Sequence, residues 1–460
     1  MAKTAAVILA AGKGTRMHSR RPKVLHAIAG KALVQHVVDE VQAAGVDQVV
    51  LVIGHGGEEV KKTLGDGFTY AWQKEQLGTG HAVMQAMAHL DPEVERVVVL
   101  SGDVPLLRGD TVKQLLDRFA QAQAKGAVLT AYVDDPSGYG RIVRDAGNKV
   151  VQIVEHRDAS PDQLTIREIN SGTYCFDKTV LEEALRELKP DNVQGEYYLT
   201  DVIQQMGRRG LTVIAFPVED PLEIMGINNR AQLAAAEAVF RDRINQRLML
   251  SGVTLIDPQT TYIDAQVRIG SDTIIYPFTI LRGNTCIGQD CLVGPNTDLT
   301  DTTVGNGVRI RQTVAEEAEI GNNCTIGPFS YLRPGTVLRD GVKVGDFVEI
   351  KNSVLEEGSK VPHLTYIGDA LIGKSVNVGA GTITCNYDGK NKYQTIIGDG
   401  TFIGSNSNLV APLKIGANAY VAAGSTLTSD VPEGSLAVAR ERQRIIPDWG
   451  KRQKTQKERT

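Results

Sequence analysis

Branched apolar residues recur at every sixth position through most of the second half of the chain. A period of six fits neither an amphipathic α-helix nor an alternating β-strand. It is typical of a parallel β-helix, in which each hexad forms one short strand and a turn and points its apolar residue inward. We therefore predict a triangular prism in which three hexads, about 18 residues, close each coil. The three runs are Ile263, Ile269, Ile275, Leu281, Ile287, Val293 and Leu299; Val308, Val314, Ile320, Ile326, Leu332, Leu338, Val344 and Ile350; and Ile397, Ile403, Leu409, Ile415, Val421 and Leu427.

Short continuous apolar runs alternate with helical patterns through the first half of the chain. Such runs are expected of strands that are buried on both faces of a sheet. Between them, Ala32–Ala44 has helical spacing and is followed by Gly45, a residue type that often ends a helix. The alternation predicts an α/β, Rossmann-like domain over residues 1–230, with a mostly parallel sheet and helices on both of its faces. The predicted strands are Ala5–Ala10, Gln48–Ile53, Arg96–Ser101 and Ala127–Val133.

One amphipathic helix is predicted between these two regions. Apolar residues recur at steps of three and four from Leu233 to Leu248, and arginines occupy other positions of the same segment. A helix of about 20 residues is roughly 30 Å long, so it can link two domains as a rod. We assign residues 231–251 to this linker helix, and residues 252–460 to a hexapeptide-repeat β-helix with a basic tail.

The composition suits a globular protein that binds neither nucleic acid nor a membrane. The net charge is −4, and aromatic residues make up only 5% of the chain, too few for a base-stacking surface. The five cysteines include no CxxC pair, so reduced thiols in the cytoplasm are expected. The apolar start Ala5–Ala11 runs directly into a glycine loop, which favours a buried strand over a signal peptide. No stretch approaches the roughly 18 apolar residues that a membrane span needs.

The end of the chain is strongly basic. Between Arg440 and Thr460 there are eight Lys or Arg residues and only three acidic ones. Such a segment is either a solvated end or a positive collar for an anionic ligand. The sequence leaves both interpretations open.

A glycine loop follows the first predicted strand. In Leu9-Ala10-Ala11-Gly12-Lys13-Gly14-Thr15-Arg16, small residues let backbone N–H groups approach phosphate oxygens, which Arg16 and the later Lys23 can neutralise. The loop is not a Walker motif, because Gly14 stands where Ser or Thr would follow the lysine. It is not the dinucleotide fingerprint either, because Met17 takes the place of the third glycine. Two glycines alone are as consistent with a tight turn as with a ligand loop.

Polar residues further along the first half complete a candidate nucleotide site. Asp103 follows a predicted buried strand, at the sheet edge where open α/β sheets bind ligands, although a lone aspartate there can also cap a turn. Gln73 and Gln76 offer amide groups that suit the edge of a base. The polar candidates for a sugar and a metal are Gly140, Glu155, Asn170 and Asn228.

The second half contains a single histidine, His363, at a point where the hexads are interrupted. Such a histidine is commonly a surface or packing residue. Here Arg333 and Lys351 lie one predicted coil apart and can stack on one face, and the non-hexad stretch Thr382–Thr395 predicts a projecting loop. A base, cations for a phosphate and amides for a sugar suit acyl transfer. One histidine excludes a zinc site of three imidazoles.

Together the glycine loop, Asp103 and the downstream hexads resemble the sugar-phosphate nucleotidyltransferases. More specifically, they resemble the bifunctional bacterial GlmU family, in which N-acetylglucosamine-1-phosphate uridyltransferase is joined to glucosamine-1-phosphate acetyltransferase, over essentially the whole chain. The resemblance implies a front site, in the first half, where UTP reacts with N-acetylglucosamine 1-phosphate. There Asp103 and Asn228 would hold Mg²⁺, and Arg16 and Lys23 would act on the transferring phosphates. The binding residues that it implies are Leu9, Ala10, Ala11, Gly12, Lys23, Gln73, Gln76, Gly78, Thr79, Ser101, Gly102, Asp103, Gly140, Glu155, Asn170 and Asn228.

The resemblance also implies a rear site, in the second half, for acetyl transfer. His363 would take the proton from the amine of glucosamine 1-phosphate as that amine attacks acetyl-CoA. The β-helix of this family is left-handed and trimeric, with acetyl sites between subunits, so a homotrimer is expected. The sugar-phosphate residues would be Arg333, Lys351, Tyr366, Asn377 and Lys392, with Asn386 also orienting the sugar, and the acetyl-CoA residues would be Ala380, Asn386, Tyr387, Ser405, Ala423 and Arg440.

Three functions are consistent with parts of this pattern. The leading interpretation is a bifunctional cytoplasmic enzyme that makes UDP-N-acetylglucosamine, a precursor of the cell wall, from small-molecule substrates. A second is a single-activity sugar-1-phosphate nucleotidyltransferase with a structural β-helix, against which His363 and its neighbouring cations argue. A third is a scaffold or exchange-factor subunit, against which Asp103 and the glycine loop argue.

Overall fold

The computed structural model describes residues 2–457, so Glu458 and Arg459 of the predicted basic tail lie outside the described residues. The chain forms two compact units, Met1–Arg241 and Asp242–Thr460. The division falls within helix α8 (Arg230–Leu250), which covers most of the segment predicted as a linker helix. In the described part of the chain, no helix has the length and apolar character needed to cross a membrane.

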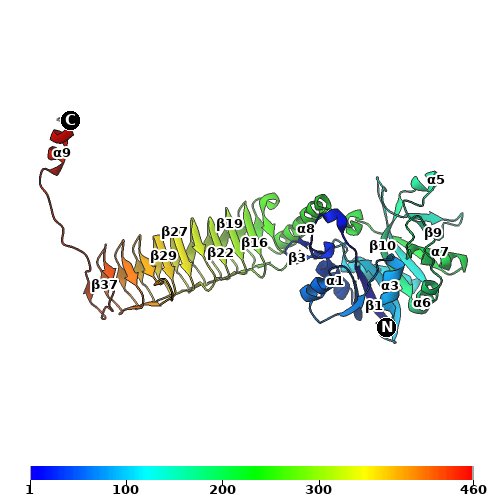
Figure 1. Ribbon diagram of the computed structural model, residues 1–460, viewed down its shortest axis with the longest axis horizontal. Coiled ribbons are helices and arrows are strands. Elements are labelled where there is room, and N and C mark those ends of the chain that lie inside the picture. The colour runs from blue at the N-terminus through cyan, green and yellow to red at the C-terminus, as the bar shows by residue number, and fades with distance from the viewer. Residues whose placement is uncertain (1, 458–460) are drawn as a thin grey trace. The chain divides into compact units, whose positions relative to one another are not determined.

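The first unit is built on a nine-stranded mixed sheet (Figure 1). All strands of its main path run parallel except β10, which lies antiparallel between β6 and β7. The four predicted strands correspond to β1, β4, β6 and β7. A hairpin of β8 (Arg141–Arg144) and β9 (Val150–Val154) pairs with β10. The main path is β11 (Val213–Pro217), β7 (Gly126–Tyr132), β10 (Glu168–Asp177), β6 (Val94–Ser101), β1 (Lys3–Ala10), β4 (Gln48–Ile53) and β5 (Thr69–Trp72).

Helices cover both faces of this sheet, and this explains why its strands are continuous apolar runs. Along β1, Ile8 and Ala10 enter one apolar core and Ala5 and Val7 enter the other. Helices α1, α2 and α4 pack on the first core, and α3, α6 and α7 on the second. The helices are α1 (Leu33–Ala43), α2 (Gly57–Leu64), α3 (Thr79–Met87), α4 (Gly109–Gln121), α5 (Pro161–Leu164), α6 (Lys178–Arg186) and α7 (Thr200–Arg208).

The second unit is a parallel β-helix, so the prediction from the hexads is confirmed (Figure 1). Its short strands run from β12 (Thr254–Leu255) to β39 (Leu436–Ala437) and pair in three parallel ladders, one for each face of a triangular coil. Near the start of the unit, the ladders join inward residues one full coil apart. The pairs are Ile269 with Ile287, Ile275 with Val293, and Leu281 with Leu299.

One predicted core position in the β-helix is wrong, because the coil is shorter than expected there. Val314 is 42% exposed, and its neighbour Ala315 takes the buried position opposite Leu299. Leu299 and Ala315 are sixteen residues apart, since five-residue steps replace two of the three hexads. Val308 is buried, but the residue that pairs in the ladder is Ile310. A shift of one residue turns a strand's side chains to the opposite face, so a strict period of six fails at this point.

The hexads also break where the rear site is predicted. Strand β29 (Lys360–Gly368) runs past a corner of the coil and carries His363, beside β27 (Lys343–Lys351). The stretch predicted as a loop first continues as β32 (Ile383–Cys385), so the projecting loop itself is 386–394. The ladder then resumes at β33 (Thr395–Ile397), which pairs with β30 (Ala370–Ile372).

Candidate active sites

A cavity of about 280 Å³ lies at the carboxyl ends of β1 and β6 in the first unit. This is the edge of a parallel sheet where ligands commonly bind. The sequence did not predict three of its lining residues, Val24, Ala82 and Glu196. The cavity brings together most of the residues predicted for the nucleotide, namely Leu9, Ala10, Ala11, Gly12, Lys23, Gln73, Gln76, Gly78, Thr79, Ser101 and Asp103.

The glycine loop packs closely against Lys23. Gly14 has a φ of +58° and precedes a 3-10 turn, η1 (Thr15–Met17). A Cβ at Gly14 would lie 2.6 Å from the Cβ of Lys23, so a larger residue would displace the lysine. Within the turn, Arg16 Nη2 donates a hydrogen bond of 2.8 Å to Asn228 Oδ1. The loop therefore gathers two cations and an amide at the mouth of one site.

Lys23, Asp103 and Asn228 form one ionic cluster. Lys23 Nζ donates to the Asp103 carboxylate and, at 3.3 Å, to Asn228 Oδ1. The side chains of Lys23 and Asp103 are each only 16% exposed. The N–H of Ile227 donates to the Asp103 carbonyl at 2.9 Å, which holds the Asn228 segment beside the end of β6. Two different oxygen ligands therefore converge on one cation, away from most of the solvent that would weaken the pair.

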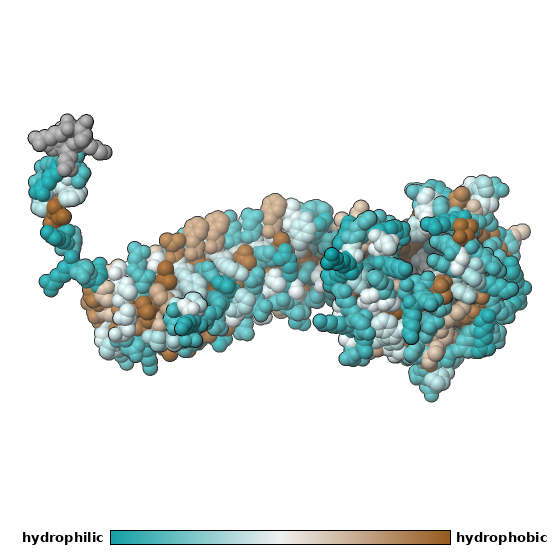
Figure 2. Space-filling view, viewed as in Figure 1, coloured by the Kyte–Doolittle hydropathy of each residue, from teal (hydrophilic) through white to brown (hydrophobic). Residues whose placement is uncertain are grey.

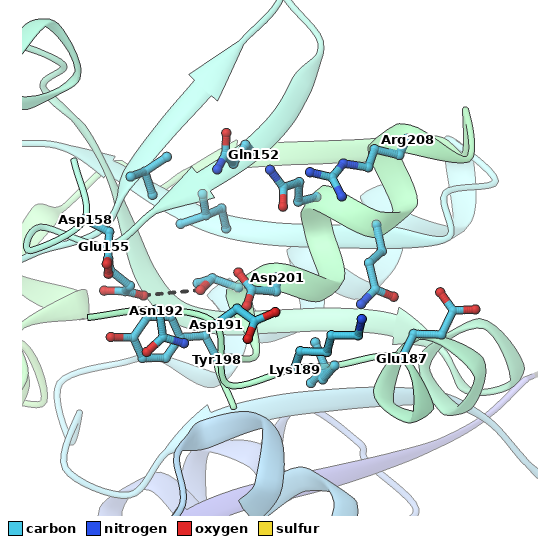
Figure 3. Close-up of a pocket in the computed structure, with 16 residues that line it drawn as sticks. Gln152, Glu155, Asp158, Glu187, Lys189, Asp191, Asn192, Tyr198, Asp201 and Arg208 are labelled. Atoms are coloured by element: carbon cyan, nitrogen blue, oxygen red, sulfur yellow. Dashed lines mark hydrogen bonds between the residues drawn. The ribbon is translucent and has the colours of Figure 1, made fainter. Parts of the chain in front are cut away.

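The residues predicted for the sugar lie around the β8–β9 hairpin. The N–H of Asn170 donates to the Gly140 carbonyl at 2.9 Å, and its side-chain Nδ2 donates to the Tyr174 hydroxyl at 2.7 Å. Glu155 lines a neighbouring cavity of about 560 Å³ together with Asp158, Tyr198 and Asp201 (Figure 3).

Two hydrogen bonds connect the segment at the start of α7 to residues that line these cavities. The Thr200 hydroxyl donates to Glu155 Oε1 at 3.4 Å, the contact that is dashed in Figure 3. The N–H of Leu199 donates to Thr79 Oγ1 at 3.1 Å. One segment therefore contacts a residue of each cavity. Thr200 was not predicted, because a threonine at the start of a helix is common and does not by itself indicate a site.

Burial raises the pKa of two carboxyl groups that line the second cavity, Glu155 and Asp201. It raises the pKa of the Glu155 carboxyl above its ordinary value, because loss of water disfavours the charged form, and the bond from Thr200 opposes this only in part. The pKa of Asp201 is raised for the same reason, with a further contribution from the charge of Asp158. Carboxyl groups of this kind suit hydrogen bonding to sugar hydroxyls.

In the second unit, His363 lies at a corner of the β-helix and contacts a carboxylate. It pairs in register with Asp346 of β27, and its Nδ1 lies 2.7 Å from Asp346 Oδ1. The bond from His363 holds the pKa of Asp346 below its ordinary value. With Nδ1 carrying the hydrogen of this bond, Nε2 is the atom free to accept a proton. The sequence missed Asp346, and its only signal is a position seventeen residues before His363, close to one coil.

The predicted cations lie on adjacent coils. The N–H of Arg333 donates to the Ile350 carbonyl at 2.8 Å, so Arg333 lies beside Lys351. Its guanidinium donates to Glu349 Oε1 at 2.7 Å, and Glu349 is a further residue that the sequence did not predict. Contact with the Lys392 ammonium lowers the pKa of Lys351. Two neighbouring ammonium groups repel each other, and a bound phosphate relieves that repulsion.

Tyr366 and Asn386 lie over Gly368. A Cβ at Gly368 would overlap the Tyr366 hydroxyl and lie 2.8 Å from Asn386 Nδ2. Asn386 Nδ2 also donates to one oxygen of Asp369 at 2.5 Å, and Asn352 Nδ2 donates to the other at 2.6 Å. Asp369 thus holds the first residue of the projecting loop against the β-helix, a role that the sequence did not predict.

Four of the residues predicted for coenzyme A lie on successive coils near the end of the β-helix. The N–H of Asn406, next to Ser405, donates to the Ala380 carbonyl at 2.7 Å. Arg440 Nη1 donates to the Ala423 carbonyl at 2.9 Å, so the first residue of the basic tail is held to the coils.

Two other predicted residues lie apart from this group. Asn377 of β31 (Asn377–Val378) pairs in register with Phe402. Tyr387 is 60% exposed in the projecting loop. Within the described residues, neither forms a hydrogen bond with His363.

Comparison with known proteins assigns both units to families. Residues 5–221 match the nucleotidyl transferase family, and residues 317–352 and 394–429 match the bacterial transferase hexapeptide family. The bifunctional protein GlmU of Heliobacterium modesticaldum is 57% identical over 445 residues, with 97% of each chain covered. Proteins of the same name from a Geobacillus species and from Carboxydothermus hydrogenoformans are each 53% identical, and 96% and 97% of this chain are covered.

The chain belongs to the GlmU family. As a member of that family it is a bifunctional transferase, with its nucleotidyl transferase match in the first unit and its hexapeptide matches in the second. This confirms the family resemblance and the class of activity that the sequence motifs predicted. The roles of individual residues stay predictions.

A GlmU-type front site implies Mg²⁺, and the residues present fit that ion. Mg²⁺ prefers oxygen ligands and commonly takes one or two from the protein and the rest from phosphates and water. The Asp103 carboxylate and the Asn228 carbonyl oxygen are ligands of this kind. They already converge on a cation, the Lys23 ammonium.

Proposed function

We propose that this GlmU family member makes UDP-N-acetylglucosamine in two steps at two separate sites. The rear site transfers the acetyl group of acetyl-CoA to the amine of glucosamine 1-phosphate. The front site then joins the product to the uridylyl group of UTP and releases pyrophosphate. The observation that carries the proposal is that each unit holds its own reactive cluster, Lys23–Asp103–Asn228 in one and Asp346–His363 in the other.

Acetyl transfer at the rear site needs a base. The amine of a hexosamine is substantially protonated near neutral pH, and only its neutral form attacks a thioester. His363 Nε2 accepts a proton from the attacking nitrogen as the N–C bond forms. It returns this proton to the sulfur as the C–S bond breaks, so coenzyme A leaves as its thiol. Asp346 accepts from Nδ1 and so keeps Nε2 directed outward. Arg333, Lys351 and Lys392 bind the sugar phosphate, and Tyr366, Asn377 and Asn386 orient the sugar.

Coenzyme A lies along the last coils in this proposal. Ala380, Asn386, Tyr387, Ser405, Ala423 and Arg440 are its contacts. The Arg440 guanidinium, which reaches the Ala423 carbonyl, brings positive charge to the coils where an anionic cofactor would lie. For Arg440, the first residue of the basic tail, this favours a role in binding an anionic ligand over a purely solvated end.

Uridylyl transfer at the front site needs positioning and charge neutralisation more than a base. The sugar phosphate is already ionised, and one of its oxygens attacks the α-phosphorus of UTP while the bond to pyrophosphate breaks. Arg16 and Lys23 neutralise the phosphate oxygens, and the glycine loop supplies backbone N–H groups. Gly140, Glu155 and Asn170 bind the N-acetylglucosamine moiety. Asp103 and Asn228 would hold Mg²⁺, which would supply further positive charge to the phosphates.

A homotrimer is part of the proposal. Phe347 and Leu364 are exposed and directly follow Asp346 and His363, and Phe347 stacks on exposed Phe329 with ring centroids 5.4 Å apart. Hydrophobic residues are visible among hydrophilic ones on the face of the β-helix shown in Figure 2. Exposed apolar strips of this kind suit burial against another subunit. A second copy covering this corner would also enclose His363.

We further propose that the protein works in the cytoplasm on small molecules. Residues 1–230 form the uridylyltransferase domain, 231–251 the linker helix and 252–460 the acetyltransferase domain. The five cysteines are free where the structure describes them, as expected for a reducing compartment.

An assay of the purified full chain tests both steps. Glucosamine 1-phosphate, acetyl-CoA, UTP and Mg²⁺ are supplied together, and the release of coenzyme A and pyrophosphate is followed. Both products are expected, and pyrophosphate release is expected to require acetyl-CoA unless N-acetylglucosamine 1-phosphate is supplied directly. Pyrophosphate without coenzyme A would favour a single-activity nucleotidyltransferase with a structural β-helix.

A further inference from the structure

We infer that His81 is a positioning residue that fixes the side-chain amide of Gln73 and thereby sets the base selectivity of the front site. The inference rests on the proposed uridylyl transfer and adds a residue that does not itself line the cavity. It follows from the hydrogen bonds around one buried amide.

The nitrogen of the Gln73 amide is fully used by the protein. Gln73 follows β5, lines the front cavity and is only 3% exposed. Its Nε2 donates to the Gly78 carbonyl at 3.1 Å and lies 3.1 Å from Nδ1 of His81. A carbonyl oxygen only accepts, so the Gly78 contact identifies this end of the amide as the nitrogen. Both N–H groups are then engaged, and Oε1 is left without a partner among the described residues.

The same bonds determine the tautomer of His81. Nδ1 accepts from Gln73, so the hydrogen of a neutral imidazole must be on Nε2. Gln85 Nε2 lies 3.2 Å from His81 Nε2, and two N–H groups cannot bond each other, so the Gln85 amide must be turned to let its oxygen accept from His81. His81 and Gln85 are four residues apart on α3 and therefore share one face of the helix. The three side chains donate hydrogen bonds in a single direction, from Gln73 to His81 and from His81 to Gln85.

This direction decides what the cavity presents to a base. Oε1 of Gln73 is an acceptor, and Gly78 and Thr79, which line the same cavity at the start of α3, have N–H groups that donate to no described residue. An acceptor beside a donor matches the imide edge of uracil, which offers N3–H beside a carbonyl. Cytosine offers a bare N3 where uracil carries a hydrogen, so this arrangement disfavours it.

The loop that carries the donors is held in place. Tyr197 makes two backbone hydrogen bonds to it, each 2.8 Å long. Its N–H donates to the Leu77 carbonyl, and its own carbonyl accepts from the N–H of Gly80. Gly78 has a φ of +108°, and a Cβ there would lie 2.6 Å from the Tyr197 carbonyl oxygen. With the loop fixed, the orientation of the Gln73 amide is the element of the base site that a substitution at His81 can change.

Substitutions of matched shape test the inference in the full chain. His81→Leu removes the acceptor, whereas the Oδ1 of His81→Asn takes nearly the position of Nδ1 and restores it. Gln85→Leu removes the group that fixes the tautomer. The measurement is kcat/KM for UTP and for CTP with saturating N-acetylglucosamine 1-phosphate, followed by pyrophosphate release. Acetyl transfer by the same preparations reports whether the second unit is intact, and thermal unfolding reports the fold of the first.

His81→Leu is expected to lower the preference for UTP over CTP about tenfold, chiefly through the KM for UTP, as expected for one lost bond to a buried amide. Gln85→Leu is expected to lower it about threefold, and His81→Asn to keep it within about threefold of wild type. An unchanged preference in His81→Leu and Gln85→Leu would overturn the inference, as would an equal loss in His81→Asn. A wild-type enzyme without uridylyl transfer would instead refute the proposed function.

Discussion

The front and rear sites hold their charges in different surroundings. At the front, the side chains of Lys23 and Asp103 are each 16% exposed and lie in a cavity made by one chain. At the rear, the side chains of His363 and Asp346 are 59% and 40% exposed on the surface of the β-helix. Charges interact strongly where water is excluded and weakly where it is not. This difference agrees with the proposal that one chain builds the front site and a second subunit covers the rear site.

The chemistry of the two steps agrees with this difference. The attacking group at the front is ionised before it binds, so that site needs neutralisation of charge more than a base. The attacking amine at the rear must lose a proton, so an imidazole with an oriented free nitrogen is required. The two sites should therefore respond independently to substitution, and only the rear one should respond to assembly.

The largest expected effect is on acetyl transfer in His363→Ala. Loss of the general base is expected to lower kcat for acetyl transfer about 10²–10⁴-fold. Uridylyl transfer from supplied N-acetylglucosamine 1-phosphate should stay within about twofold of wild type, and it serves as the internal control. Both rates are measured on one preparation by release of coenzyme A and pyrophosphate. A parallel loss of both activities would contradict the independence of the sites.

The reciprocal change is Asp103→Ala. It removes a proposed Mg²⁺ ligand and leaves the Lys23 ammonium without its carboxylate, so uridylyl transfer is expected to fall about 100-fold. Added Mg²⁺ should restore part of the activity by mass action, and acetyl transfer should be unaffected. A titration of pyrophosphate release against Mg²⁺ measures this. A wild-type rate of uridylyl transfer in Asp103→Ala would contradict the proposal that Asp103 binds Mg²⁺.

The third change tests whether the rear site, unlike the front site, depends on assembly of the trimer. Phe347→Asn removes an exposed ring beside Asp346 at a position where φ is +56°, a conformation that Asn adopts more readily than Phe. We expect a weaker trimer, with acetyl transfer lowered about tenfold at dilute protein and uridylyl transfer unchanged. Phe402→Asn changes an exposed ring that contacts Tyr420 in a tilted pair and serves as the control. Sedimentation at several concentrations, alongside both assays, provides the measurement. Acetyl transfer independent of concentration would show a self-contained rear site.

Sequence periodicity was a better guide to the β-helix than to its register. The hexads predicted the prism because an apolar side chain every six residues has few other folded solutions. They misplaced Val314, because a coil can shorten by a residue and still close. The strand β10 was also missed, because the buried polar residues Asn170, Ser171 and Thr173 interrupt the continuous apolar run that marks its neighbours.

Residues that act through other residues were the hardest to predict. Asp103 and His363 stand out in the sequence because of a strand end and a break in the hexads. Asp346, Glu349 and Asp369 do not, because their roles arise only when one coil stacks on the next. His81 likewise depends on the path that brings α3 against Gln73. Pairing between coils fixes the partners of Asp346, Glu349 and Asp369, and the packing of α3 fixes that of His81, so the sequence carries little signal for any of them.

The smallest and most specific effect is expected for Asp346→Asn. The bond from His363 lowers the pKa of the Asp346 carboxyl, so this group stays ionised to a lower pH than usual. Asn retains an acceptor for Nδ1–H and removes the charge. The kcat for acetyl transfer should therefore fall only a few-fold, because Nε2 keeps its direction and still removes the proton.

Asp346→Leu separates the charge of Asp346 from its hydrogen bond. It removes both, so it should lower kcat more than Asp346→Asn does at every pH. Uridylyl transfer should keep its wild-type pH profile in both variants. If kcat for acetyl transfer were the same in Asp346→Asn, Asp346→Leu and wild type, neither the charge nor the hydrogen bond of Asp346 would influence the base. His363 would then depend on a neighbouring subunit for its environment, which would sharpen the contrast between a front site built by one chain and a rear site that several chains share.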